Sequence, residues 1–194
     1  MTTFPRYILS DIHGLTSLIN NDDKKDDINN LNILKLNKVE CRTTNNTAYR
    51  VIRYDKNFLS RDLIRTYGLC RSVIVNNDNK VVGFAPPKSI SSEDFISSYS
   101  EKDTGIVAEE FVEGTMINVF WDDSIGVSGG WEIATRNTVG ATSSFYKGPQ
   151  AKTFRDMFLE AAKETNLVLD TLAKTICYSF VLQHPENRIV VPFK

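Results

Sequence analysis

Cysteine and histidine are scarce in this sequence, with 3 and 2 residues among 194. The cysteines, Cys41, Cys70 and Cys177, lie far apart, are odd in number and form no C-x-x-C pair. This pattern argues against a disulfide framework and against a structural zinc site. We therefore expect a reducing, intracellular compartment and no bound metal.

Net charge and long apolar runs are also lacking. The 23 Lys and Arg residues balance the 24 Asp and Glu residues to a net charge of −1. No strong overall field attracts nucleic acid or an anionic membrane, so any such binding must be local. No window approaches the ~20 apolar residues of a membrane span, and the N-terminus reaches charged residues too soon for a signal peptide. We expect no membrane association.

What is present is the composition of an ordinary globular protein, with 41% hydrophobic and 24% charged residues. A chain of this length can bury a core and corresponds to one domain, or to one domain with an appendage. Residues 20–30, NNDDKKDDINN, are typical of a solvated loop. We divide the chain into an N-terminal segment, 1–45, with this acidic Asn/Asp-rich loop, and a domain, 46–194. A single domain overall is the alternative.

The alternation of apolar and polar residues predicts more strands than helices, and hence an α+β fold. The run NNDN, 76–79, joins two β-branched segments and indicates a hairpin. The expected strands are Arg6–Ser10, Leu31–Leu36, Ala48–Tyr54, Arg71–Val75, Lys80–Phe84, Gly105–Val112, Thr115–Trp121, Trp131–Thr135, Tyr178–Leu182 and Arg188–Phe193. The expected helices are Leu15–Ile19, a turn at Asp62–Tyr67, a serine-capped helix within 91–99, and Thr153–Lys174.

The N-terminal sequence RYILSDIHG resembles the opening motif of the calcineurin-like metallophosphoesterases, in which Asp11 and His13 would bind a metal. A dinuclear hydrolase needs several further Asp, Asn and His ligands. The chain has one other histidine, His184, and no second motif of that family. We therefore interpret Asp11 as a helix cap and His13 as a surface residue.

Three longer blocks, in order, cover most of the chain after the acidic loop: Tyr49–Val75, Glu109–Ala141 and Tyr178–Phe193. Together they resemble the nucleotidyltransferase domain of the phage-type RNA ligase 1 family, and its relatives encoded by large DNA viruses most closely. The resemblance implies a covalent nucleotidyltransferase fold, with antiparallel β-sheets and flanking helices. It also implies ATP and Mg²⁺ as cofactors of an active member. Two further family elements, a glutamate-bearing strand and a Lys-x-Lys strand, have no counterpart in these residues, so we expect the C-terminal part of the fold to be absent from them.

The family's Lys-x-x-Gly element supplies the lysine that attacks ATP. Aligning it on Gly114 places Phe111 at the lysine position, and a benzyl side chain has no nucleophile. Two lysines are weak substitutes. Lys80 begins a K-x-x-G at Lys80–Gly83, and Lys88 lies in FAPPKSI, where the family also has a basic residue near its pocket.

The third block also lacks a polar residue that the family uses at its active site. Val181 stands where the resemblance places a glutamate that accepts a hydrogen bond from the ribose, and valine cannot accept one. In the first block, Ser72 replaces a glycine after the family's arginine. The residues that the resemblance implies for nucleotide binding are Arg71, Lys88, Glu113, Gly114, Arg136 and Arg188.

These departures favour an RNA ligase-like domain that has lost adenylyl transfer and is a binding or structural module. A component of a virion or of a viral replication compartment would fit, with RNA or other viral proteins as partners and the host cytoplasm, virus factory or virion as location. One alternative is an active ATP-dependent RNA ligase that uses Lys80 or Lys88, with ATP and Mg²⁺. The other is a non-catalytic RNA-binding protein. Its basic and aromatic residues would be Arg50, Arg53, Arg61, Arg65, Arg71, Tyr49, Tyr54 and Tyr67.

Overall fold

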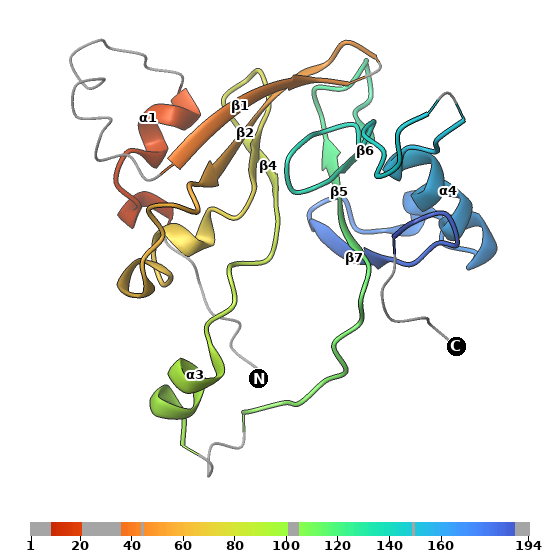
Figure 1. Ribbon diagram of the computed structural model, residues 1–194. Helices are drawn as coiled ribbons and strands as arrows, with labels where there is room; N and C mark the ends of the chain where they lie inside the picture. Colours follow the sequence, from red (N-terminus) through yellow and green to blue (C-terminus); the bar gives the residue numbers. More distant parts are fainter. Residues whose placement is uncertain (1–8, 21–35, 44, 101–104, 149, 189–194) are drawn as a thin grey trace.

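The computed structural model describes residues 9–20, 36–43, 45–100, 105–148 and 150–188. Two antiparallel sheets lie side by side, with one helix on the outer side of each (Figure 1). The first sheet has the order β1-β2-β3-β4, with β1 Leu36–Arg42, β2 Ala48–Tyr54, β3 Val73–Val75 and β4 Val81–Phe84. The second has the order β6-β5-β7, with β5 Thr115–Asp122, β6 Gly130–Ala134 and β7 Tyr178–Leu182. The predicted α+β class is confirmed.

The predicted hairpin between β3 and β4 is confirmed, and the asparagine side chains explain its turn. Asn76 Oδ1 accepts hydrogen bonds from the backbone N–H groups of Asp78 at 3.0 Å and Lys80 at 3.1 Å. Asn79 adopts a left-handed conformation, with φ 60°. Asparagine tolerates this conformation because its side chain can bond locally.

The first sheet buries one face against the N-terminal helix α1, Leu15–Asn20. Ile12 and Leu15 pack against alternate residues of the central strands, including Ile52 and Val73. Strands β1 and β2, which lie on either side of the predicted boundary at residue 45, pair from Leu36↔Tyr54 to Arg42↔Ala48.

The second sheet buries its outer face against α4, Phe154–Glu164. Ile117 and Val119 of β5 pack there against Met157 and Phe158, as the helical spacing of these apolar residues predicts. α4 begins with a capping box, in which Thr153 Oγ1 accepts from the backbone N–H of Asp156 and the Asp156 carboxylate accepts from the backbone N–H of Thr153.

The predicted end of this helix at Lys174 is wrong. α4 ends at Glu164, because Asn166 adopts a left-handed conformation with φ 57°, and the backbone N–H groups of Asn166 and Leu167 bond back to the carbonyls of Lys163 and Ala162. A residue of that conformation is a common helix terminator. Only a short 3₁₀ turn, Leu169–Thr171, follows before β7.

The predicted strand Gly105–Val112 is also wrong. These residues are exposed and extended, and 106–112 form no hydrogen bond within the part of the chain described. A strand requires a neighbour to satisfy its backbone groups, and this segment passes outside both sheets (Figure 1). The capped helix before it is confirmed as α3, Ser92–Ser98, with Ser91 at its N-cap.

The remaining predictions concern short segments. Two 3₁₀ turns, Arg61–Leu63 and Tyr67–Leu69, lie where a helical turn at Asp62–Tyr67 is predicted. Residues 9–10 of the first predicted strand belong instead to a 3₁₀ turn, Leu9–Asp11. Three predicted strands lie largely outside the described residues, namely Arg6–Ser10, Leu31–Leu36 and Arg188–Phe193. Residues 21–30 of the acidic loop lie outside them as well. Of the described ends, Leu36 begins β1 and Arg188 lies in no strand.

The two sheets are joined through their facing sides. Tyr49, Val51 and Ile74 of the first sheet pack against Phe120 and Ala134 of the second. A buried polar bridge completes this contact, in which the Tyr49 hydroxyl donates to Asp122 Oδ2 at 2.8 Å and Asn76 Nδ2 donates to Asp122 Oδ1 at 3.0 Å. The sheets therefore have a fixed relative orientation.

Candidate functional site

The residues picked out by the motifs lie at one end of the two sheets. β3 and β5 finish together at the other end, where Asn76 bonds to Asp122. Their starts therefore share the opposite end, and antiparallel pairing places the ends of β4, β6 and β7 there as well. We call this the motif end, and the end with the Asn76–Lys80 turn the hairpin end. The residues at or just beyond the motif end are Arg71, Lys88, Glu113, Gly114, Arg136 and Arg188.

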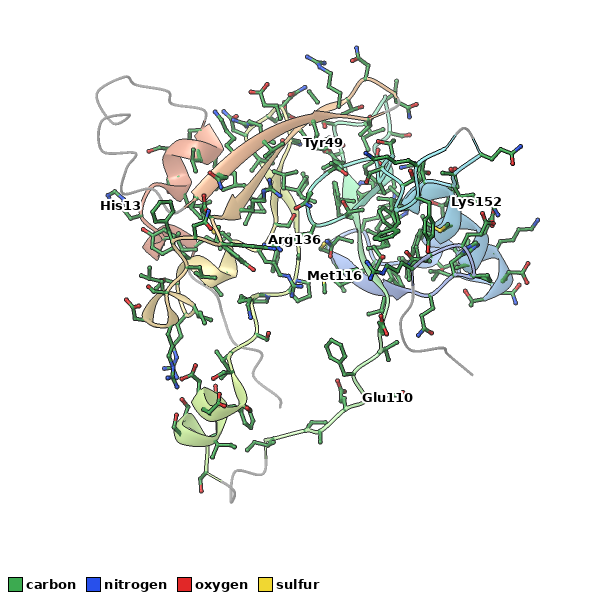
Figure 2. All side chains as sticks on the ribbon, in the orientation of Figure 1. His13, Tyr49, Glu110, Met116, Arg136 and Lys152 are labelled. Carbon is green, nitrogen blue, oxygen red and sulfur yellow. The ribbon has the colours of Figure 1, made fainter. Side chains whose placement is uncertain are left out.

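Arg71 and Arg136 come together at the motif end. Arg136 Nε donates to the backbone carbonyl of Arg71 at 3.5 Å, and its guanidinium lies 5.0 Å from the ring centroid of Tyr54. Figure 2 shows Arg136 between the two sheets. Arg71 Nε is buried without a hydrogen-bond partner. Neither arginine forms an ion pair with any described residue, so both cations remain available to an anion.

Two further buried groups lack partners, one just before β3 and one in the middle of β5. Ser72 Oγ and Asn118 Nδ2 are both fully buried and unpaired. Ser72 shares its face of β3 with Ile74, and Asn118 shares its face of β5 with Phe120, so both side chains lie on the facing sides of the sheets. Asn118 is held there because its Oδ1 accepts from Ser179 Oγ at 2.8 Å.

Sequence reasoning missed both of these residues as donors. Ser72 was notable only for replacing a glycine, and Asn118 was not singled out. The available signal was an asparagine at an inward-facing position of the alternating run TMINVF, 115–120. That signal identifies a buried polar group, but it does not reveal that the group lacks a partner.

The two candidate lysines lie at opposite ends. Lys88 is at the motif end, where its backbone N–H donates to the carbonyl of Gly68 at 2.9 Å. Its ammonium is exposed and bonds to the carbonyl of Ser89 at 2.8 Å. Lys80 is exposed in the hairpin turn, beyond the far end of β5 from Gly114. At about 3.4 Å per residue, an eight-residue strand spans roughly 24 Å.

Gly114 begins β5 in very close contact with β7. A Cβ at this position would lie 2.5 Å from the carbonyl oxygen of Leu182 and 2.8 Å from Val181 Cγ1. The neighbouring Glu113 is held by its backbone, whose carbonyl accepts from Gln183 Nε2 at 3.0 Å. The resemblance therefore marks a glycine that the sheet itself requires.

The positions aligned with the catalytic lysine and the ribose-binding glutamate carry apolar, exposed side chains. Phe111 is 94% exposed, on the extended segment that also carries Glu110 in Figure 2. Val181 pairs with Met116 across β7 and β5 and is 45% exposed. Neither side chain offers an amine or a hydrogen-bond acceptor.

Arg188 follows a loop that is fixed to the second sheet. Asn187 is buried, and its Nδ2 donates to Thr115 Oγ1 at 3.0 Å and to the carbonyl of Leu182 at 3.3 Å. Asn187 therefore ties the end of β7 to the start of β5. Arg188 lies 5.4 Å from the ring centroid of Phe145 and is exposed.

The arginines of the first block do not form a single surface. Arg50 bonds to Asn79 at the hairpin end, while Arg61 forms an ion pair with Asp94 of α3. Arg65 bonds to Ser98 at 3.3 Å. Two arginines of this block remain near Arg136. They are Arg71 and Arg53, and Arg53 bonds to Asn137.

The three cysteines and His13 give no indication of a reactive site. Cys41, Cys70 and Cys177 are free thiols, and burial raises the pKa of Cys70 to about 12, so this thiol stays protonated. His13 is exposed on α1's side of the first sheet, as predicted (Figure 2). Within the described ranges there is no group of three or more His, Cys, Asp or Glu side chains arranged to hold a metal. Among the same residues, no helix has the length and apolar character to cross a membrane.

The comparisons with known proteins point to RNA ligases over part of the chain. Over 92 residues the sequence is 30% identical to an RNA ligase of Rhodothermus phage RM378. This match covers 44% of the chain and 20% of that protein, so the similarity spans about a fifth of the ligase. No family model and no solved structure matches the chain. The chain thus has a partial similarity to an RNA ligase, on a fold of antiparallel sheets with flanking helices.

Proposed function

We propose that this chain is an RNA ligase-like domain that binds a nucleotide between its sheets without forming a covalent adduct, and so acts as a binding module. The observation that carries the proposal is a set of unpartnered donors at the motif end and on the facing sides of the sheets. Arg71 Nε, Ser72 Oγ and Asn118 Nδ2 are buried and unpaired, and the guanidinium groups of Arg71 and Arg136 have no ion-pair partner among the described residues. Buried polar groups are normally hydrogen-bonded, so such a cluster favours a polar, anionic ligand.

The donors fit a nucleoside triphosphate in chemical terms. Arg71 and Arg136 would hold phosphate oxygens, because a planar guanidinium can donate two parallel hydrogen bonds to them. Ser72 and Asn118 would bond to oxygen or nitrogen atoms of the nucleoside. Bound ATP would supply an activated adenylyl group, but Phe111 and Val181 offer it neither a nucleophile nor a ribose acceptor.

The first test separates binding from transfer. The protein would be incubated with α-labelled ATP, and separately GTP, with Mg²⁺, and then examined by denaturing electrophoresis and intact mass. Calorimetric titration with ATP would measure reversible binding. We expect measurable binding, no adduct, and at least a tenfold loss of affinity in Arg136→Gln, because a charged hydrogen bond contributes about 1.5–3 kcal/mol. A covalent nucleotide, or unchanged affinity in Arg136→Gln, would contradict the proposal.

An active ligase that uses Lys88 is the second candidate. It is favoured by the position of Lys88 at the motif end, next to the turn Tyr67–Leu69 that leads into Arg71. If an adduct forms, Lys88→Ala should abolish it while Lys80→Ala leaves it intact, because Lys80 lies at the hairpin end. Mapping the adduct to neither lysine would exclude this candidate.

A further inference from the structure

A second hollow lies at the hairpin end of the first sheet, away from the proposed nucleotide site. Its volume is about 450 Å³. It is formed by the end of β1 and the start of β2 together with the turn between β3 and β4. The lining residues are Glu40, Cys41, Arg42, Ala48, Tyr49, Arg50, Asn77 and Asn79.

Arg50 is the unusual member of this lining. It is only 8% exposed. Its Nη2 donates to the carbonyl of Asn76 at 3.2 Å and to Asn79 Oδ1 at 2.6 Å, both uncharged acceptors. Its Nη1 is buried and has no hydrogen-bond partner. No carboxylate among the described residues forms an ion pair with this guanidinium. Burying a cation without a counter-ion costs free energy. An anion beside this guanidinium would therefore stabilise it.

The nearest acid in the lining does not fill that role. Glu40 lies directly opposite Arg50 in the register of β1 and β2, but its side chain is exposed and makes no ion pair with Arg50. Arg42, two residues along the same strand, bonds to Asn46 Oδ1 at 3.4 Å. Two cations and one acid therefore line the hollow, which gives it a positive balance.

We propose that this hollow binds an oxyanion, specifically a phosphate group, through Arg50. Arg50 lines the hollow and its guanidinium is fixed by Asn76 and Asn79, so a phosphate there would meet an oriented cation that has no anionic partner among the described residues. The hollow has room for more than the phosphate itself, so it admits either inorganic phosphate or a phosphate ester of a small molecule. The site is separate from Arg71 and Arg136 and does not depend on the proposed nucleotide binding.

The test compares phosphate with sodium chloride at equal ionic strength, by thermal unfolding and calorimetric titration. We expect phosphate to raise the Tm of the native chain more than chloride does. Arg50→Lys keeps the charge but loses the planar fork, so its phosphate affinity should fall about tenfold or more. Arg50→Met should lose the phosphate-specific shift. Arg65→Gln, which changes an exposed arginine outside both proposed sites, is the matched control and should keep the shift.

Glu40→Gln distinguishes the proposal from an internal ion pair. Removing a carboxylate from the lining should raise phosphate affinity severalfold. If Glu40→Gln instead loses stability equally in both salts and gains no affinity, Glu40 is the partner of Arg50 and the proposal is wrong. Equal shifts in phosphate and chloride would also overturn it, since the effect would then be one of ionic strength alone. Inorganic phosphate and ribose 5-phosphate, titrated separately, identify which source binds more tightly, and either one supports the site.

Discussion

At the scale of single residues, Gly114 has the least space of the motif residues. Replacing it with alanine would push a methyl group to 2.5 Å from the Leu182 carbonyl oxygen, so the start of β5 would have to separate from β7. We expect Gly114→Ala to lower the free energy of unfolding by about 1–3 kcal/mol, the usual cost of overpacking. Urea denaturation measures this.

Gly148 provides a matched control for Gly114. The two glycines have similar φ values, 159° and 154°, but a Cβ at Gly148 would meet nothing within 4 Å. Gly148→Ala should therefore cost clearly less. Equal losses in the two variants would mean that backbone conformation, rather than contact with Leu182, determines the choice of glycine at residue 114.

The residues of the candidate site were partly accessible from the sequence. Motif resemblance singles out Arg71, Gly114 and Arg136, and the fold places all three at one end of the sheets. Ser72 and Asn118 could not be found in the same way. Their significance depends on which strand faces they share and on the absence of a bonding partner, and both depend on long-range pairing that a local pattern does not contain.

At the scale of elements, the capping box of α4 makes a testable contribution. Thr153→Ala removes the oxygen that accepts from the backbone N–H of Asp156 at 3.1 Å. Because α4 buries Met157 and Phe158 in the second core, we expect a loss of about 1 kcal/mol in unfolding free energy, measured by urea denaturation.

Ser91→Ala is the matched control for this cap. Ser91 caps α3 in the same way, accepting from the backbone N–H of Asp94 at 3.1 Å, but α3 buries no residue. The substitution should therefore fray α3 with little change in global stability. If Ser91→Ala costs as much as Thr153→Ala, α3 is more strongly coupled to the sheets than its exposure indicates.

Strands were predicted well where alternation coincides with a partner, and badly where it does not. Ala48–Tyr54 and Tyr178–Leu182 match β2 and β7, because each pairs with a neighbouring strand and buries apolar side chains in a core. The run Gly105–Val112 has the composition of a strand but no neighbour in the described fold. The helix at Thr153 was predicted too long, because Asn166 breaks it through a backbone conformation that apolar spacing does not report.

At the scale of the whole molecule, the ionisation of Asp122 makes the stability of the contact between the two sheets depend on pH. Burial alone would raise the pKa of Asp122, but hydrogen bonds from the backbone of Ser124, from Asn76 and Tyr49, and from the Ser124 hydroxyl outweigh it and hold the pKa below its ordinary value. A carboxyl whose pKa is lowered on folding stabilises the fold above its unfolded pKa, about 3.9. That contribution is lost as pH falls through the lower, folded value.

We therefore expect the native chain to lose stability on acidification below about pH 4 more steeply than Asp122→Asn does. Asp122→Asn should be less stable at neutral pH and should approach the native chain in acid. Thermal unfolding between pH 2 and 7 tests this, a range that brackets the usual carboxyl pKa of about 4. Asp123→Asn, at the adjacent exposed position, should follow the native profile, and identical profiles for all three proteins would contradict the argument.

The link between the sheets has a topological consequence. The chain leaves the first sheet at β4 and enters the second at β5, and residues 106–112 of that connection form no hydrogen bond in the described structure. The sheets are held instead by side chains of Tyr49, Ile74 and Phe120 and by the Asp122 bridge. A cut after Glu110 would therefore break the polypeptide without removing any of these contacts. The molecule has the construction of a split protein, whose two fragments carry complementary faces and could reassemble after being produced as separate chains.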